Sequence, residues 1–147
     1  MKFSKRSEYG IRAAVRLARS YGKGYVQSRE IASSEDLPAK FLESILLALR
    51  SGGILESKVG AGGGYRLTRP PQEIRVGELL KTLVGVDQDQ EQRSDLADAS
   101  MGQHALNVIV ERMNEAIDRE VGEMTLAELL TIAEERAGGD PPTMYYI

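Results

Sequence analysis

A chain of 147 residues without a single cysteine is long enough to bury one hydrophobic core, and it excludes a disulfide framework, a thiolate zinc site, a cysteine-ligated iron–sulfur cluster and a cysteine nucleophile. No 18 apolar residues follow one another and the N-terminus lacks the apolar run of a signal peptide, so we expect a cytoplasmic protein. The net charge of −3 is unevenly divided along the chain. Residues 1–81 carry 15 Lys and Arg against 8 Asp and Glu, whereas residues 82–147 carry 4 Lys and Arg against 14 Asp and Glu. This division suits one surface that binds a polyanion and another that faces solvent or a partner.

Two helices are predicted near the N-terminus. The first is amphipathic and ends at the glycines of the sequence YGKG, and its apolar stripe comprises Ile11, Ala14, Val15 and Ala18. The second is short, because Ser28 is a good N-cap residue and the apolar pattern runs only to about Ser34.

The stretch LPAKFLESILLALRSGG predicts a third helix, with Pro38 in its first turn and two glycines at its end. Its apolar face comprises Phe41, Leu42, Ile45, Leu46 and Leu49. Its outer face is led by Lys40, Glu43 and Ser44, with Leu47 beside them. A short helix, a turn of about three residues and a strongly amphipathic helix together are typical of a helix-turn-helix.

Four of the five residues from 60 to 64 are glycine, between the β-compatible runs ILESK and YRLTR. A phosphate-binding P-loop or a dinucleotide-binding turn would lead into a helix, whereas here the run from Tyr65 to Thr68 has the pattern of a strand and the Walker lysine is absent. The glycines therefore predict the tip of a β-hairpin. The expected fold is mainly α with a small β-hairpin wing, a winged helix-turn-helix DNA-binding domain over residues 1–84 followed by a long dimerisation helix.

These elements indicate DNA binding. The major groove of DNA admits a helix, so Lys40, Glu43 and Ser44 can meet base edges, and a glutamate can accept a hydrogen bond from cytosine N4. The wing would lay Lys58 and the glycine backbone against a minor groove or phosphates. Further phosphate contacts, which make affinity dependent on salt, are expected from Arg6, Arg12 and Arg29.

The segments KFSKRSEYGIRAAVRLA, FLESILLALRSGGILESKVGAGGGYRL and PPQEIRVGELL resemble the Rrf2 family of bacterial winged-helix regulators, and the resemblance spans essentially the whole chain. It implies a homodimer that reads a pseudo-palindrome of double-stranded DNA, with DNA contacts at Tyr9, Lys40, Glu43, Gly60, Gly62 and Gly63. The complete expected set is Ser4, Tyr9, Ser28, Arg29, Pro38, Ala39, Lys40, Glu43, Ser44, Lys58, Gly60, Gly62 and Gly63. Four positions depart from the family pattern: Pro38 and Lys40 replace small hydroxyl residues, Val59 replaces an arginine, and Ala61 replaces a proline.

The second half divides into an acidic loop over residues 85–101, dimerisation helices over residues 102–137 and a tail over residues 138–147. The long helix carries an apolar seam suited to packing along another helix, formed by Leu106, Val110, Met113, Ile117 and Val121. The alternative is that this seam packs within its own chain. Thr125 and Glu128 form a capping box for a last helix.

No cofactor, metal or enzymatic activity is expected. Many members of the family hold an iron–sulfur cluster through three cysteines before the long helix, and the resemblance places those positions near Asp89, Asp95 and Met101, with His104 near a histidine ligand. No thiolate remains to hold iron. One histidine in an acidic loop makes a poor metal site, and it has no partner that the sequence can place for acid–base catalysis.

The chain ends in an apolar tip behind a Gly, Asp and Pro linker, formed by Met144, Tyr145, Tyr146 and Ile147. This ending resembles that of the cysteine metabolism repressors of the family, and a C-terminal isoleucine is also how serine acetyltransferase docks into cysteine synthase. The resemblance implies a repressor of sulfur and cysteine genes that is controlled by cysteine synthase, with O-acetylserine competing for the same pocket. Docking of the tail on its own dimer is the alternative.

Two other functions stay open at this point. One is a family regulator that senses a small molecule or a metal between the wing domain and the long helix, without an iron–sulfur cluster. The other is a winged helix used only for protein contacts, against which the division of charge along the chain argues.

Overall fold

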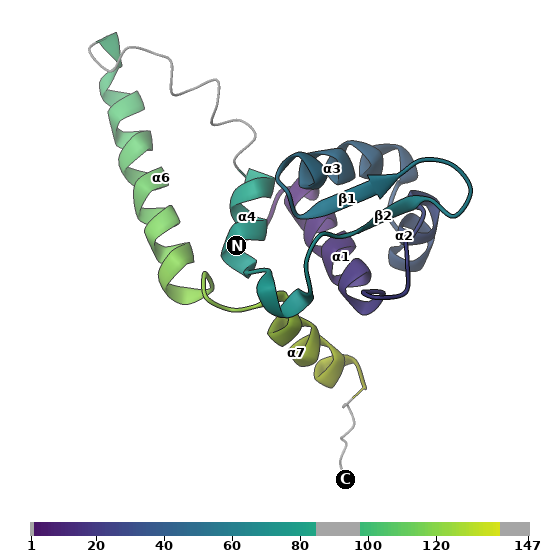
Figure 1. The fold of residues 1–147 in the computed structure, drawn as a ribbon. Coiled ribbons are helices and arrows are strands. Elements are labelled where there is room, and N and C mark those ends of the chain that lie inside the picture. Colours follow the sequence, from purple (N-terminus) through teal and green to yellow (C-terminus); the bar gives the residue numbers. More distant parts are fainter. Residues whose placement is uncertain (1, 85–97, 139–147) are drawn as a thin grey trace.

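The computed structural model describes residues 2–84 and 98–138. Three helices and a hairpin form the first part, and a long helix stands to one side of them (Figure 1). In chain order the elements are α1 (Lys5–Arg19), α2 (Ser28–Glu35), α3 (Ala39–Ser51), β1 (Leu55–Lys58), β2 (Gly64–Leu67), the 3-10 helix η1 (Pro71–Glu73), α4 (Val76–Val84), α6 (Met101–Glu120) and α7 (Leu126–Gly138). The tail over residues 139–147, with all four apolar residues of its tip, and residues 85–97 of the acidic loop lie outside the described residues.

Helix α1 begins at a side-chain cap, which supplies the acceptor that an N–H group of its first turn would otherwise lack. The hydroxyl of Ser4, its N-cap residue, accepts a hydrogen bond from the backbone N–H of Ser7 at 3.2 Å. One face of α1 then packs so closely on α4 that a Cβ added to Gly10 would lie 2.2 Å from Cδ2 of Leu83. The glycine therefore sets how near these two helices approach.

Helices α2 and α3 form the predicted helix-turn-helix, with Asp36 to Pro38 as the turn. Asp36 adopts a left-handed conformation with a φ of 52°. The predicted N-cap at Ser28 is wrong, because Gln27 is the N-cap residue and Ser28 is the first helical residue. Gln27 stays extended since Val26, just before it, pairs with Tyr65 of β2. Pro38 is likewise the N-cap residue of α3 rather than part of its first turn.

Strands β1 and β2 pair as the predicted antiparallel hairpin, with Leu55 opposite Leu67 and Lys58 opposite Gly64. One side of the hairpin faces the core, which is why Leu55 and Leu67 are buried while Arg66 is exposed. The core lies between this side of the hairpin, the helices α1 to α3, and α4 with the start of α7. Its largest fully buried side chains are Leu17, Ile31, Leu42, Ile45, Leu46, Leu49, Ile54, Leu55, Leu67, Ile74, Leu79 and Leu126.

Phe41 is the exception to the predicted apolar face of α3. It is 50% exposed instead of buried. Its ring meets the ring of Tyr9 edge to face, with centroids 6.0 Å apart and an interplanar angle of 89°. Phe41 thus lies at the surface, in contact with Tyr9 of α1, instead of in the core.

Helix α7 is fastened to the start of α4 by backbone hydrogen bonds. The N–H of Val76 donates to the carbonyl of Met124 at 2.8 Å, and the N–H of Leu126 donates to the carbonyl of Ile74 at 2.7 Å. One of the two bonds of the predicted capping box is present, since Thr125 Oγ1 accepts a hydrogen bond from the N–H of Glu128 at 3.1 Å. This junction fixes where the chain returns after α6.

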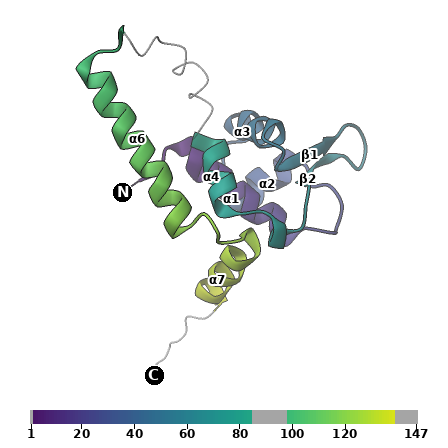
Figure 2. The same ribbon diagram turned by 60° about the vertical axis from the view of Figure 1, so that its left-hand side comes forward.

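Helix α6 leans away from the rest of the molecule, as the turned view shows (Figure 2). It has no buried residue. Its clearest polar contact with the other elements is the ion pair between Lys81 of α4 and Asp118, with 2.6 Å between Nζ and Oδ1. In the predicted seam Leu106 is 44% and Met113 is 53% exposed, whereas Ile117 and Val121 are half-buried.

Candidate nucleic-acid interface

The outer face of α3 is exposed, as the sequence predicts. It presents the side chains of Pro38, Ala39, Lys40, Glu43 and Ser44. The hydroxyl of Ser44 donates to the backbone carbonyl of Phe41 at 3.0 Å, which leaves its lone pairs free to accept. A helix of 13 residues is about 20 Å long, a size that fits a major groove.

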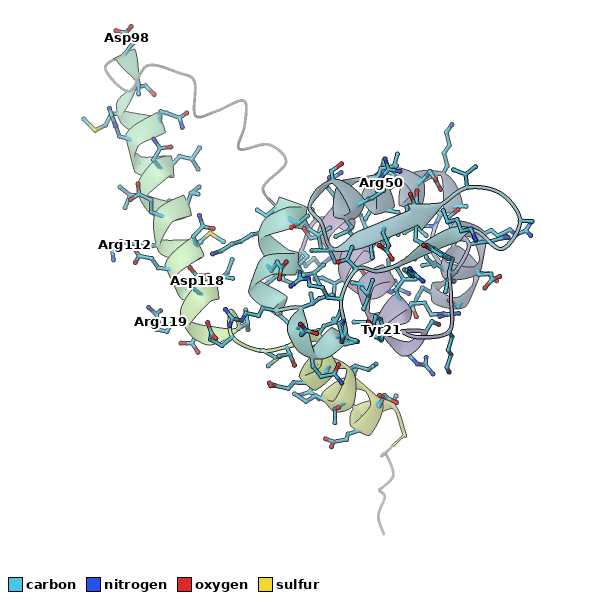
Figure 3. The ribbon with its side chains drawn as sticks, viewed as in Figure 1. Tyr21, Arg50, Asp98, Arg112, Asp118 and Arg119 are labelled. Carbon is cyan, nitrogen blue, oxygen red and sulfur yellow. The ribbon has the colours of Figure 1, made fainter. Side chains whose placement is uncertain are left out.

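Glu43 is tied to the hairpin. Its Oε1 accepts a hydrogen bond from the hydroxyl of Tyr65 on β2 at 3.2 Å. Burial, followed by the nearby Glu43 carboxylate, raises the pKa of Tyr65 above 10.0, so the hydroxyl remains a donor at neutral pH. Seven residues along α3, Arg50 (Figure 3) donates to Ser57 of β1 at 2.9 Å. The two bonds fasten one side of α3 to the hairpin.

The glycines between the strands have two different structural causes. Gly60 and Gly62 have φ values of 92° and 73°, a backbone conformation that other residues rarely adopt. Gly63 is needed for space, since a Cβ there would lie 2.2 Å from the carbonyl oxygen of Lys58. The glycines therefore build a tight turn between two strands, not a phosphate-binding loop before a helix.

Two cations lie over the same aromatic ring at the base of the turn. The Lys58 ammonium lies 5.9 Å, and the Arg66 guanidinium 4.3 Å, from the centroid of Tyr25. Arg66 also forms an ion pair with Glu56 across the hairpin. Because Lys58 forms no ion pair with any residue within 2–84 or 98–138, its charge is available to an external anion.

A crevice of about 540 Å³ joins the start of α2, the side of α3 and the hairpin. Six of the predicted residues line it: Ser28, Arg29, Glu43, Lys58, Gly60 and Gly63. Ser28 and Arg29 belong to the first turn of α2, where free backbone N–H groups and the helix dipole favour an anion. The structure thus brings Glu43 of α3, the start of α2 and the hairpin part of the predicted set to one crevice. The lining of this crevice does not include the other predicted residues, Ser4, Tyr9, Pro38, Ala39, Lys40, Ser44 and Gly62.

The arginines of α1 are more engaged than the sequence suggests. Arg12 pairs with Glu35 of α2, with 3.3 Å between Nε and Oε1. Arg6 donates to the carbonyl of Leu83 at 3.4 Å. In the described part of the chain Arg29 has no such ion pair. Of the three expected phosphate contacts, Arg12 is therefore the one that a carboxylate already neutralises, while Arg6 and Arg29 form no ion pair in the described ranges.

Three functional candidates were not predicted from the sequence. Phe41 is exposed next to Tyr9, whose ring lies 5.8 Å below the ammonium of Lys5. Tyr65 and Arg50 both line the crevice. The seven-residue spacing between Glu43 and Arg50, two helical turns, is a signal for Arg50, whereas no local pattern indicates the contact between Tyr65 and Glu43.

A second, apolar groove of about 560 Å³ lies between α6 and the helices α1, α4 and α7. Its lining includes Ile11, Leu80, Met113, Ile117, Val121 and Leu129. Three of these six, Met113, Ile117 and Val121, belong to the predicted seam. Leu106 and Val110 lie nearer the start of α6 and are exposed.

Neither a metal centre nor a membrane segment is found in the described ranges. No group of three or more potential ligand side chains occurs within residues 2–84 and 98–138. His104 is exposed in the first turn of α6, where its N–H donates to the carbonyl of Ser100. The described helices include none that is both long and apolar enough to cross a bilayer.

Known proteins match this chain in sequence and in fold. The profile of the Rrf2 family, described as "Iron-dependent Transcriptional regulator", matches residues 3–132. The chain is 34% identical over 85 residues to the HTH-type transcriptional regulator CymR of Bacillus subtilis, covering 58% of this chain and 62% of CymR. It is 35% identical over 85 residues to IscR of Cereibacter sphaeroides, covering 56% of this chain and 55% of IscR. The chain spans little more than half the length of the curated relatives it matches.

Two solved structures have the same fold over nearly the whole chain. T. potens IscR matches with a TM-score of 0.71 and 32% identity, covering 99% of this chain and 97% of that one. CymR, described as the global cysteine regulator of B. subtilis, matches with a TM-score of 0.66 and 27% identity, covering 90% and 98%. These matches confirm the predicted fold class, mainly helical with a hairpin wing. The relatives are transcriptional regulators and not enzymes.

Proposed function

Because the chain belongs to the Rrf2 family of transcriptional regulators, we propose that it acts as a homodimer that binds double-stranded DNA. One observation carries the proposal: the exposed outer face of α3 adjoins a glycine-tipped hairpin across a crevice lined by Arg29 and Lys58. A convex helix beside a narrow, cationic hairpin matches a major groove with the phosphates or minor groove next to it.

Each part of this surface has a role in the proposed complex. Helix α3 enters the major groove, where Lys40 donates to a guanine or a phosphate and Glu43 accepts from cytosine N4. The start of α2 and Arg29 hold a phosphate. Lys58 and the bare turn of Gly60 and Gly62 lie against the neighbouring backbone or minor groove.

The first test selects bound duplexes from a random-sequence pool and then measures their affinity by fluorescence anisotropy over a range of salt concentrations. We expect affinity to fall linearly in a log–log plot, and Lys58→Ala to reduce the slope by about one per protomer, because one phosphate contact is lost. Arg112→Ala is the matched control, since Arg112 is an exposed cation on α6, far from the hairpin (Figure 3). Binding that does not depend on salt, or equal effects of the two substitutions, would contradict the proposal.

The homodimer is proposed to form through α6. Leu106, Val110 and Met113 of the seam are exposed, Ile117 and Val121 are half-buried, and the adjoining groove of about 560 Å³ is apolar. A second copy of the chain can cover both, because the same seam and groove are available on each protomer and a two-fold arrangement makes them meet. The resulting pair of α3 helices would read the two halves of a pseudo-palindromic operator.

We further propose that the regulated genes serve sulfur and cysteine metabolism and that cysteine synthase is the input. The likeness to CymR, a global cysteine regulator, supports this role, as does the apolar C-terminal tip ending in Ile147. Cysteine synthase would take the terminal carboxylate and Ile147 into its active site, and the complex would repress. O-acetylserine, the substrate of the same site, would compete and release the repressor.

The tail is tested by calorimetric titration of the full chain into the cysteine synthase of the same organism. We expect binding that is lost when O-acetylserine is added and when Ile147 is deleted, because the last side chain and its carboxylate fill the pocket. Lys2→Ala, an exposed change at the other end of the chain, is the control and should leave the affinity unchanged. Equal affinity with and without Ile147 would contradict this role of the tail and would favour the alternative, in which the tail docks on its own dimer.

A further inference from the structure

Tyr65 is held firmly by its backbone. Its N–H donates to the carbonyl of Val26 at 2.8 Å, and its carbonyl accepts from the N–H of Val26 at 2.9 Å. The residue as a whole is only 7% exposed. The position of the Tyr65 hydroxyl is therefore set by the packing of the hairpin on the segment before α2, and the hydroxyl has little freedom to follow a moving partner.

The partner of that hydroxyl, Glu43, is by contrast an exposed side chain with three rotatable bonds. In the described ranges the bond from Tyr65 is the one hydrogen bond to its carboxylate, and no ion pair is formed with it. Arg50, on the same side of α3, is bonded to Ser57 instead. Without Tyr65 the carboxylate would sample several rotamers, which costs conformational entropy when a base fixes it.

The hydrogen bond from Tyr65 occupies one oxygen of the Glu43 carboxylate and leaves the other oxygen free. Oε1 accepts from Tyr65, so Oε2 keeps its lone pairs for the N4 amino group of a cytosine. We propose that Tyr65 is a positioning residue that fixes the direction of the Glu43 carboxylate and thereby sets the preference for cytosine at one position of each operator half-site. This inference rests on the proposed function, and it adds a residue of the hairpin to the reading of bases by the helix.

Replacing Tyr65 by phenylalanine isolates the hydroxyl, because the ring that packs in the core is kept. The preference is measured by anisotropy as the ratio of affinities for a selected duplex and for the same duplex with the cytosine replaced. We expect Tyr65→Phe to lower this ratio about three- to tenfold, and Glu43→Ala to abolish it. The salt dependence should not change, since no phosphate contact is lost. Tyr25→Phe is the matched control: its ring, which stacks under Arg66, is likewise kept.

The double variant separates positioning from a merely structural role. If Tyr65 acts through Glu43, Tyr65→Phe has no further effect on the preference in the Glu43→Ala background. Three results would each overturn the inference. The first is an affinity ratio that Tyr65→Phe leaves unchanged, and the second is a ratio that Glu43→Ala leaves unchanged. The third is an effect of Tyr65→Phe on the ratio that persists in the Glu43→Ala background. Failure of the wild-type chain to bind any selected duplex would instead overturn the proposed function itself.

Discussion

At the scale of single residues, the hairpin depends on a glycine that adopts a positive φ and also leaves room for a neighbouring backbone segment. Gly64 opens β2 with a φ of 138°. A Cβ at this position would lie 2.3 Å from the carbonyl oxygen of Val26 and 2.5 Å from its carbonyl carbon. Both atoms belong to the backbone that holds Tyr65, so the hairpin could accept a side chain here only by giving up its contact with the segment before α2.

We therefore expect Gly64→Ala to lower the free energy of unfolding by at least about 1–3 kcal/mol, through strain at positive φ and displacement of Val26. Gly138→Ala is the control, because Gly138 is the last residue of α7, has an ordinary φ and would place its Cβ in open space. Urea unfolding followed by circular dichroism measures both variants. Equal stability of the two would show that the hairpin tolerates a side chain at its base.

At the scale of elements, the local patterns predict much of the fold. Apolar spacing indicates α1, α2 and α3, and the glycine run between alternating residues indicates the hairpin. The patterns predict the ends of the helices less well. Ser28 is chemically the better N-cap for α2, but the N-cap residue is Gln27. It directly follows Val26, which pairs with Tyr65, 39 positions along the chain. A cap can be read locally only where no distant strand fixes the backbone before it.

In the candidate site, too, local patterns predict some of the residues, and contacts between elements decide the others. The outer residues of α3 and Lys58 follow from helical and strand periodicity. Periodicity places Phe41 at the edge of the apolar stripe and so predicts burial, whereas in the structure its ring is at the surface against Tyr9 of α1. The bond between Glu43 and Tyr65 spans 22 positions, and no periodicity sets how the hairpin packs on α3. Contacts between elements were thus the part that the sequence could not supply.

At the scale of the whole molecule, α6 is the element least explained by its own chain. It has no buried residue, although a helix in water gains most of its stability from packing an apolar face. Met113 is half exposed at the rim of the apolar groove. A second protomer would supply the missing packing for the helix and the groove together.

We expect the wild-type chain to sediment at about twice its 16.1 kDa, and Met113→Asp to sediment as a monomer, because an unpaired carboxylate would be buried in the dimer but exposed in the free chain. Glu115→Ala is the control: it lies two residues along α6, roughly 200° around the helix axis. Sedimentation equilibrium distinguishes the species. A monomeric wild type, or a Met113→Asp variant that stays dimeric, would rule out this interface.

The unequal distribution of charge also governs how the molecule approaches a duplex. The basic segment up to residue 81 includes α3 and the hairpin, while the acidic segment includes α6 and α7, which lie away from the hairpin (Figure 1). A net charge of −3 would by itself repel the chain from a polyanion. The separated charges form an electric dipole, however, and in the proposed complex the field of a duplex would exert a torque on this dipole that turns the basic segment toward the DNA before contact. Productive orientation thus begins about one Debye length from the surface, roughly 10 Å at 0.1 M salt.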